Sequence, residues 1–542
     1  MSSAFSKPFF VLINRCQRKI RRFCITLVLV SLFGCIQSNA PTPLPIAGTL
    51  TSTSSQFPST QTFSPSHEKP PGSQPQLFDI PWEDRDIFKI GLASESQDMA
   101  NALPGASVYH IDLEIADNLL EVNGKIEILY TNREGQPLDE LQLRLFPNIL
   151  GGKMEIKSTQ VDGIDTTPYY GLENSLLRIP LKSSLNPDEK AVISMQFEVI
   201  VPSDLGVNYG VFSAADHVLA YAHGYPMVAV YNENGWNAEI PSPSGDVTFS
   251  DASFYIIRIT ASKELTIVAS GSELELKVEN NKQQVTYVSG PSRDFYFAAS
   301  EDYKKTSQTT GGVEVNFYAP ASFQQSANMS VEIARKALKD FSTRYAPYPY
   351  KELDFVATPT LALGIEYPGV IAIADRIMVP GGTINNTPVS YYLEPTIAHE
   401  VGHQWFYNLV GNDQLNDPWL DESLAQFSTL QYYFDQYGAS GAQRFRNSLE
   451  NRWSRVDRAK IPIGLPVRAY TDEEYGAIVY GRGGLFFEAL RDKMGQQVYD
   501  EFLKDYTISF AWDIATVDRF KAYAEQHCHC NLDLLFQEWI YQ

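Results

Sequence analysis

The chain has 542 residues, of which 44% are hydrophobic and 20% are charged, so its composition is that of an ordinary globular protein. This length is enough for about three domains. The formal net charge of −21 argues against a nucleic acid as partner and favours solubility. The five cysteines are too few for a disulfide framework, so the fold must depend on its hydrophobic core.

The first 35 residues have the pattern of an export signal. A basic cluster from Arg15 to Arg22 precedes an apolar run from Phe23 to Phe33, which is too short for a transmembrane helix. The run ends at Gly34 and Cys35, where the sequence resembles a bacterial lipoprotein cleavage site. We therefore predict an acylated Cys35 and a protein of the bacterial cell envelope, held outside the cytoplasm on a membrane surface by its lipid anchor. The alternative is a plain secretory signal with an incidental cysteine.

Residues 36–78 are rich in serine, threonine and proline, and they are predicted to be a disordered tether. Residues 79–103 form a connecting segment. From 104 to 302 the sequence alternates apolar and polar residues in short runs that are separated by turn residues, and no long helical pattern interrupts them. This pattern predicts an antiparallel β-sandwich-like domain.

The hydrophobic period changes near Ser326. A helical pattern ends at Pro347 and Pro349, and the runs DFVATPTL and VIAIAD are predicted to be strands. Long helical patterns then continue to the end of the chain. Residues 303–542 are therefore predicted to be a second domain with a mixed α and β start and a mainly helical remainder.

This second domain contains the motif H-E-x-x-H, formed by His399, Glu400 and His403. On a helix, residues four apart lie on one face, so both imidazoles can bind one metal ion while Glu400 lies beside it. Glu422 follows His403 after eighteen intervening residues, which include a segment of turn residues, and it lies at the start of a predicted second helix. Two histidines and a glutamate are an established ligand set for a catalytic zinc ion, and we predict one Zn²⁺ here.

The segments HEVGHQW and WLDESLA, with eighteen residues between His403 and Glu422, resemble the aminopeptidase N family of zinc metallopeptidases. The stretches PLDELQLRLFPN and YPMVAVYNENGW are similar to the N-terminal β-domain of that family. The resemblance implies a multidomain protein in which the β-sandwich-like domain precedes a thermolysin-like α+β catalytic domain.

Two further site residues are implied by this resemblance. Members of the family have a Gly-x-Met-Glu-Asn stretch whose edge strand and glutamate bind the substrate, and here Gly364 and Glu366 match while Ile365 and Tyr367 depart from it. The glutamate would hold the free α-amino group of the substrate. Tyr480 matches a tyrosine that donates to the developing oxyanion, although Arg482 replaces the usual lysine two residues later.

The sequence therefore predicts a zinc-dependent aminopeptidase with peptide substrates, in which Glu400 and Tyr480 are catalytic. The alternatives are an endopeptidase or other hydrolase on the same zinc site, and an inactive surface-binding lipoprotein. The run from His527 to Cys530 holds four potential ligands, but neighbouring residues cannot easily surround one ion. A disulfide between Cys528 and Cys530, or a plain loop, are the other possibilities.

Overall fold

The computed structural model describes residues 77–384 and 386–541. The predicted signal with Cys35, and all but the last two residues of the predicted tether, lie outside the described residues. Within the described ranges, no helix is both long enough and apolar enough to cross a membrane.

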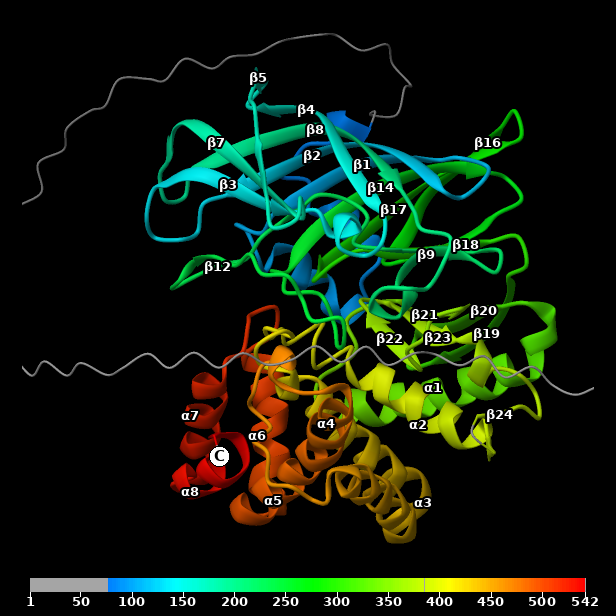
Figure 1. The fold of residues 1–542 in the computed structure, drawn as a ribbon, viewed down its shortest axis with the longest axis vertical. Helices are drawn as coiled ribbons and strands as arrows, with labels where there is room; N and C mark the ends of the chain where they lie inside the picture. Colours follow the sequence, from blue (N-terminus) through cyan, green and yellow to red (C-terminus); the bar gives the residue numbers. More distant parts are fainter. Residues whose placement is uncertain (1–76, 385, 542) are drawn as a thin grey trace, which may run out of the picture. The chain divides into compact units, whose positions relative to one another are not determined.

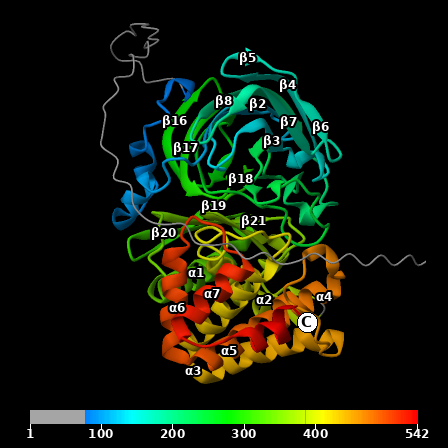
Figure 2. The same ribbon diagram turned by 90° about the vertical axis from the view of Figure 1, so that its left-hand side faces the viewer.

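The N-terminal part of the described chain is built from three larger β-sheets and a two-stranded sheet formed by β12 and β13. An eight-stranded sheet has the order β16-β17-β14-β1-β2-β8-β4-β5, and two four-stranded sheets have the orders β15-β18-β10-β9 and β11-β3-β7-β6. Figure 2 shows the large sheet curving around the smaller ones. The strands are β1 (Val108–Ile115), β2 (Glu121–Thr131), β3 (Leu138–Arg144), β4 (Lys153–Val161), β5 (Ile164–Asp165), β6 (Tyr169–Gly171), β7 (Leu176–Leu185), β8 (Lys190–Ile200), β9 (Phe212–Ala215), β10 (Val218–Ala222), β11 (Met227–Val228), β12 (Tyr231–Asn232), β13 (Gly235–Trp236), β14 (Ser253–Ser262), β15 (Thr266–Ala269), β16 (Ser272–Glu279), β17 (Lys282–Ser292) and β18 (Tyr296–Ser300).

Apolar residues at alternate positions of these strands meet in one core. Strand β8 alternates buried and more exposed residues along most of its length, as expected for a strand with one face toward a core. Ile126 and Ile193 of the large sheet share a buried cluster with Leu141 and Leu219 of the two smaller ones. The sheets are not wholly antiparallel, because β1 pairs in parallel with β14. This pairing joins strands almost 150 residues apart in sequence, so alternation within each strand could not predict its direction.

The predicted connecting segment, residues 79–103, consists largely of short 3-10 turns that pack on both domains. Phe88 stacks at a tilt on Phe254 of β14, with ring centroids 4.8 Å apart. Leu92 forms a β-bridge with Tyr350, which lies just before the second domain's central strand. The segment therefore joins the two domains.

A five-stranded mixed sheet begins the second domain. Its order is β19-β20-β21-β23-β22, so β22, which carries Glu366, is an edge strand that runs antiparallel to β23. The predicted boundary at residues 302 and 303 falls between β18 and β19, which belong to different sheets. The strands of this part are β19 (Lys304–Thr310), β20 (Val313–Ala319), β21 (Glu352–Thr358), β22 (Gly364–Tyr367), β23 (Val370–Ala374), β24 (Thr383–Ile384) and β25 (Thr387–Pro388).

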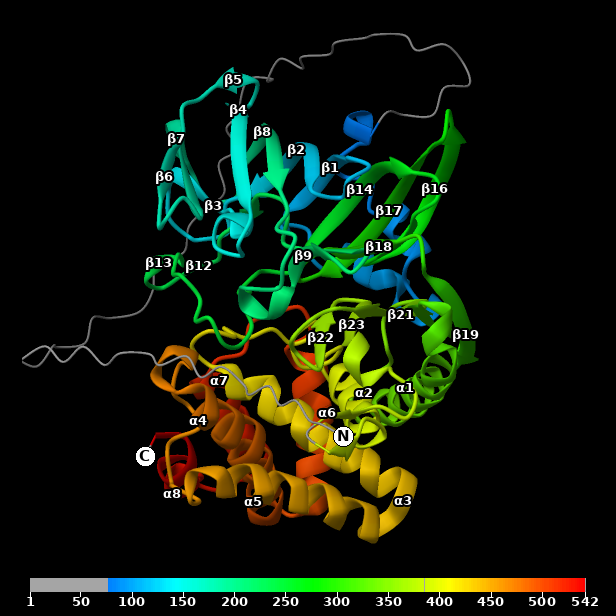
Figure 3. The same ribbon diagram turned by 45° about the vertical axis from the view of Figure 1, so that its right-hand side comes forward.

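Helices cover the face of this sheet that points away from the N-terminal sheets (Figures 1 and 3). Helices α1 and α2 lie next to the sheet, and α3 packs on both of them. The helices are α1 (Gln324–Arg344), α2 (Ser390–Gly402), α3 (Glu422–Trp453), α4 (Asp472–Ala477), α5 (Gly483–Met494), α6 (Gln496–Ser509), α7 (Val517–Cys528) and α8 (Asp533–Phe536). The multidomain fold, a sheet-rich N-terminal part followed by a mainly helical one, is the predicted one.

A buried arginine fixes the two domains to each other. Arg293, which follows β17, is 1% exposed, and its guanidinium donates hydrogen bonds to the carbonyl oxygens of Asn408, Leu409 and Asp513. A side chain at Gly411 would lie 2.5 Å from the Arg293 guanidinium carbon, so only glycine leaves room for this contact. The arginine thereby holds the turn between α2 and α3 in place.

Cys528 and Cys530, at the end of α7, are joined by a disulfide bond. The sequence left three possibilities open for this run, and the structure contains the disulfide. Both thiols are therefore consumed and cannot bind a metal ion.

Candidate metal centre

The H-E-x-x-H motif lies at the end of α2, and Glu422 begins α3. His399 is in the last turn of α2 and His403 is the residue that caps it, so their rings lie one turn apart. Asp421 caps the next helix, because its side chain accepts a hydrogen bond of 2.8 Å from the backbone nitrogen of Glu422. This cap fixes the first turn of α3 and with it the direction of the Glu422 side chain.

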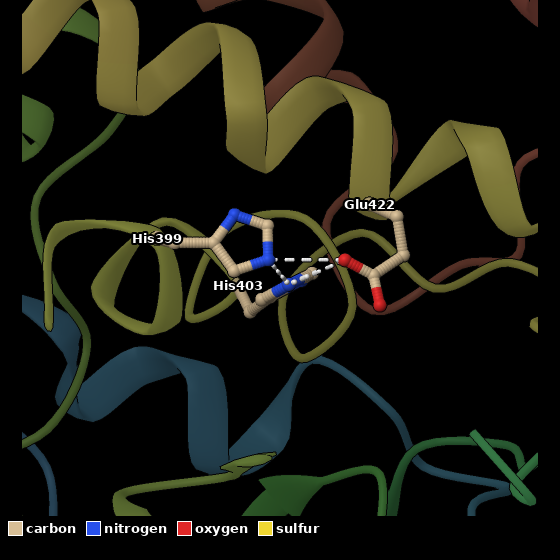
Figure 4. A group of neighbouring side chains, drawn as sticks. All are labelled: His399, His403 and Glu422. Carbon is tan, nitrogen blue, oxygen red and sulfur yellow. Dashed lines mark hydrogen bonds and ion pairs between the residues drawn. The ribbon is translucent and has the colours of Figure 1, made fainter. Parts of the chain in front are cut away.

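The three predicted ligands meet in a buried cluster (Figure 4). Glu422 Oε2 lies 3.0 Å from His399 Nε2 and 3.4 Å from His403 Nε2, and the two nitrogens are 3.2 Å apart. Zinc has bonds of about 2.0–2.1 Å to nitrogen and oxygen ligands, so two ligands of a tetrahedral site are about 3.3–3.4 Å apart. The spacing and the donor types therefore fit one zinc ion with a fourth position left for water or substrate.

Hydrogen bonds behind the rings set which nitrogen faces the ion. His403 Nδ1 lies 2.9 Å from the carbonyl oxygen of Phe406 and must donate to it, which leaves the lone pair on Nε2. His399 Nδ1 lies 3.3 Å from the side-chain amide of Gln426. The oxygen of this amide has no hydrogen-bond partner among the described residues, so it can accept a hydrogen bond from His399 Nδ1–H if the amide is rotated by 180°.

Glu400 lies next to the triad without belonging to it. It is 4% exposed, and a side chain at Gly364 would meet its carboxylate oxygen at 2.4 Å. Gly364 therefore lets the edge strand β22 pass directly over Glu400. Burial, and then the charge of Glu366, raise the pKa of Glu400 well above its usual value. A cation at the neighbouring triad would oppose this shift.

Tyr480 reaches the triad from a π-helical turn, Ile478–Arg482. Its hydroxyl donates a hydrogen bond to Glu422 Oε1, and its ring lies 5.9 Å from the His399 ring. Arg482, at the position where the resembled family has lysine, points elsewhere. It is 1% exposed and donates to the carbonyl oxygens of Ile461, Glu538 and Trp539, so it holds the C-terminal segment rather than the site.

Glu366 lies close to His403. Its carboxylate belongs to a buried group with His403 and Asp421, in which the ligand atoms all lie within 4.8 Å of one another. Gln414 donates to both acids, at 3.0 Å to Glu366 and at 2.8 Å to Asp421. Burial is the main cause that raises the pKa of Glu366, and the charge on His403 opposes it. The predicted Glu366 and Gly364 thus lie on one strand, against the metal ligands.

The comparison with known families gives a match to the peptidase family M1 domain over residues 329–539, which contains His399, Glu400, His403, Glu422 and Tyr480. Residues 329–539 of the chain are therefore a peptidase family M1 domain. The predicted resemblance to the aminopeptidase N family is therefore confirmed, and this family implies one catalytic zinc ion.

The curated relatives that the chain matches are named as aminopeptidases. Aminopeptidase 2 of Candida albicans is 25% identical over 295 residues, which are 52% of this chain and 32% of the relative. Endoplasmic reticulum aminopeptidase 2 of Homo sapiens is 25% identical over 269 residues, 47% of this chain and 27% of the relative. The chain thus spans about a third of the length of these curated relatives.

Solved structures share the fold across both domains. An M1 zinc metallopeptidase from Deinococcus radiodurans has a TM-score of 0.60 with 17% identity, covering 80% of this chain and 93% of that one. A mutant of the same metallopeptidase, bound to a Tyr-Ser-Ala substrate, has a TM-score of 0.58 with 17% identity, covering 80% and 94% of the two chains. The two-domain architecture is therefore not limited to this chain.

The metal centre of the M1 domain opens into a cavity of about 890 Å³. Gly364, Glu366, Glu400 and Tyr480 all line it, together with the three metal ligands. A second space of about 20 Å³ lies behind Glu366 and has room for about one water molecule. Every predicted site residue within the described part of the chain thus lies on one cavity.

Several residues of the M1 site were not predicted from the sequence. Asp246 comes from the N-terminal domain, lines the cavity, and has a pKa raised by burial and then by the charge of Glu366. Asp421 is completely buried, and burial followed by the charge of Glu422 raises its pKa to about 8. Asp421 could have been found from its place beside Glu422. Tyr475, which also lines the cavity, could have been found from its place near Tyr480. Asp246 and Gln414 carry no motif, and only the fold brings them here.

Proposed function

We propose that the M1 domain is a zinc-dependent aminopeptidase that removes N-terminal residues from peptides. The observation that carries this proposal is the position of Glu366, whose carboxylate lies within 4.8 Å of the ligand nitrogen of His403. If Glu366 binds the ammonium group of the substrate, only one residue fits between Glu366 and the metal centre, so the first peptide bond is the one placed at the metal. The names of the curated relatives, which are aminopeptidases, support the same activity.

Binding of the substrate would use the edge of the five-stranded sheet. Strand β22 is the last strand of this sheet, so its outer side can pair with an extended peptide. Glu366 would accept charge-assisted hydrogen bonds from the α-ammonium group, and these are strong in a site with little water. Gln414 already donates to the Glu366 carboxylate and keeps it oriented.

A zinc ion held by His399, His403 and Glu422 would supply a Lewis acid that polarises the scissile carbonyl and acidifies water. Glu400 accepts the proton of the attacking water and delivers it to the leaving nitrogen. Tyr480 turns its hydroxyl from Glu422 to the oxygen of the tetrahedral intermediate and stabilises the developing negative charge. Each of these groups lines the same cavity, so no large rearrangement is required.

The test compares free and blocked substrates with the zinc-loaded full chain. We expect hydrolysis of aminoacyl fluorogenic substrates with a free α-amino group and little hydrolysis of their N-acetylated forms. Equal hydrolysis of both forms would favour the endopeptidase alternative, and no hydrolysis of either would favour the inactive lipoprotein. The Glu400→Gln variant, purified in parallel, controls for contaminating peptidases.

We further propose that the enzyme acts outside the cytoplasm of a bacterial cell, anchored to a membrane by acyl chains on Cys35. The support is the basic cluster, the short apolar run and the Gly34–Cys35 pair of the sequence. Labelling with a fatty acid analogue should mark the wild-type protein and not the Cys35→Ser variant. Equal labelling of both, or of neither, would contradict the anchor.

A further inference from the structure

The last turns of α3 present arginines to the active-site cavity. Arg444, Ser448 and Arg452 are four residues apart on one face of α3, and Arg455 lies in the 3-10 turn Ser454–Val456 that follows the helix. All four residues line the cavity. Arg452 is the innermost of the arginines. Its guanidinium carbon lies 5.8 Å from the centre of the Tyr480 ring.

These three arginines have no partner of opposite charge. In the part of the chain that the structure describes, none of them forms an ion pair or a hydrogen bond. The arginines of the same helical stretch that do not line the cavity are paired instead. Arg446 contacts Glu450 and lies 2.9 Å from Glu488, and Arg458 lies 3.1 Å from Glu450. The chain as a whole is acidic, with a net charge of −21, yet these three arginines at the cavity have no acidic partner.

Acidic side chains of the cavity lie near His403. The charge of Glu366 acts on Asp246, the charge of Glu422 acts on both acids, and no arginine is among the main charges that act on either of them. Arg452 instead interacts mainly with Tyr480, Arg455 and Glu422. The cavity therefore has an acidic end at Glu366 and a basic wall on α3, with the metal centre and Tyr480 between them.

We propose that Arg444, Arg452 and Arg455 form a carboxylate-binding wall, which selects short peptides that carry an anionic group beyond the scissile bond. This inference rests on the proposed aminopeptidase function and names its substrate class. Guanidinium groups bind carboxylates through paired hydrogen bonds, so an unpaired arginine at a cavity suits such a group. The carboxylate can be the C-terminus of the peptide or an acidic side chain of its leaving part.

The length of the wall can be compared with that of a peptide. Arg444 and Arg455 are eleven residues apart, which corresponds to a rise of about 16 Å along α3 and the 3-10 turn after it. An extended peptide advances about 3.3–3.6 Å per residue. The row of arginines is therefore about as long as four or five residues of an extended peptide.

The experiment measures binding and turnover separately. Zinc-loaded Glu400→Gln protein is titrated with Ala-Ala-Ala, Ala-Ala-Ala-amide and Ala-Glu-Ala-amide, and the active full chain is assayed for kcat and KM with the same peptides. We expect the free acid to bind about tenfold or more tightly than the amide, as for a hydrogen-bonded charge pair. Tighter binding of Ala-Glu-Ala-amide than of Ala-Ala-Ala-amide would show that a side-chain carboxylate also occupies the wall.

Arginine variants then locate the effect. Arg452→Gln and Arg455→Gln should each reduce the preference for the acid over the amide, mainly through KM, while Arg458→Gln, whose arginine is paired outside the cavity, should retain it. The proposal would be overturned if the protein with all three arginines intact bound the acid and the amide equally well. It would also be overturned if both Arg452→Gln and Arg455→Gln kept the preference for the acid. An alanyl fluorogenic substrate without a carboxylate tests the aminopeptidase function alone. Failure of that function can therefore be distinguished from failure of the carboxylate-binding site.

Discussion

Glu422 Oε2 lies 3.0 Å from His399 Nε2, although the two residues are 23 positions apart in sequence. The contact depends on the turn between α2 and α3, which reverses the chain and starts the second helix at Glu422. Asp421 caps that helix, and Arg293 of the N-terminal domain binds the turn through backbone carbonyls. The ligand geometry is therefore supported by both domains.

Replacing Glu400 with glutamine should remove hydrolysis and leave metal binding intact. Glutamine keeps the shape of the side chain but cannot accept the proton of the attacking water, and general bases contribute about 10²- to 10⁴-fold to rate. Activity on an alanyl fluorogenic substrate and zinc content are measured on the same preparation. A variant with unchanged turnover would remove Glu400 from the scheme.

Tyr480→Phe should lower kcat by about 10²- to 10³-fold while KM changes little. The lost hydroxyl acts on charge that develops only in the transition state, and a single oxyanion donor has an effect of this size. Steady-state kinetics separate the two constants. Tyr475→Phe is the matched control, because its ring packs on Tyr480 with a centroid distance of 5.5 Å but its hydroxyl has no hydrogen-bond partner among the described residues. An effect on KM alone would contradict the assigned role.

Glu366→Gln should weaken recognition of the free N-terminus. The loss of a charge-assisted hydrogen bond costs about 1.5–3 kcal/mol, which corresponds to a factor of about ten or more in kcat/KM. Activity on N-acetylated substrates should change far less, so the ratio of free to acetylated rates is the quantity to measure. If that ratio is the same as in the wild type, Glu366 does not bind the amine.

Burial of His110 should make the protein less stable in acid. The ring is fully buried and stacks on Trp82 at 4.1 Å, and both its nitrogens lack a hydrogen-bond partner among the described residues. Burial lowers the pKa of His110 to about 4, below the usual 6.5. The unfolded chain therefore takes up the proton first, and stability that is present above pH 6.5 is lost as the pH falls toward 4.

The loss at His110 amounts to about 2 kcal/mol between pH 7.5 and pH 5. Urea unfolding at the two pH values measures it. His110→Phe preserves an aromatic ring against Trp82 and removes the titrating group, so this variant should lose less stability over the same range. An equal loss in the variant and in the wild type would show that His110 does not titrate in this way.

The metal ligands could be predicted from the sequence because their spacing is largely local. His399 and His403 are one helical turn apart, and the cap at Asp421 fixes where the helix of Glu422 begins. The family resemblance supplied Glu366 and Tyr480, since neither residue type is distinctive alone. The structure adds the edge position of β22 and the donation from Tyr480 to Glu422.

Other features depend on contacts between distant segments, which no local pattern records. The parallel pairing of β1 with β14 is one, and the approach of Asp246 to Glu366 from the other domain is another. Arg482 stands where the family motif has lysine, but the structure shows that it holds the C-terminal segment. A motif therefore locates a residue along the chain but does not determine which way its side chain points.

The most direct test of the metal centre is zinc content after dialysis, measured by mass spectrometry on the wild type and on Glu422→Ala. Glu501→Ala, which changes an exposed glutamate of α6, is the matched control. We predict one zinc ion per chain in the wild type and the control, and far less in Glu422→Ala, with hydrolysis lost in parallel. A wild type without zinc, or a Glu422→Ala variant that retains one ion per chain, would contradict the site.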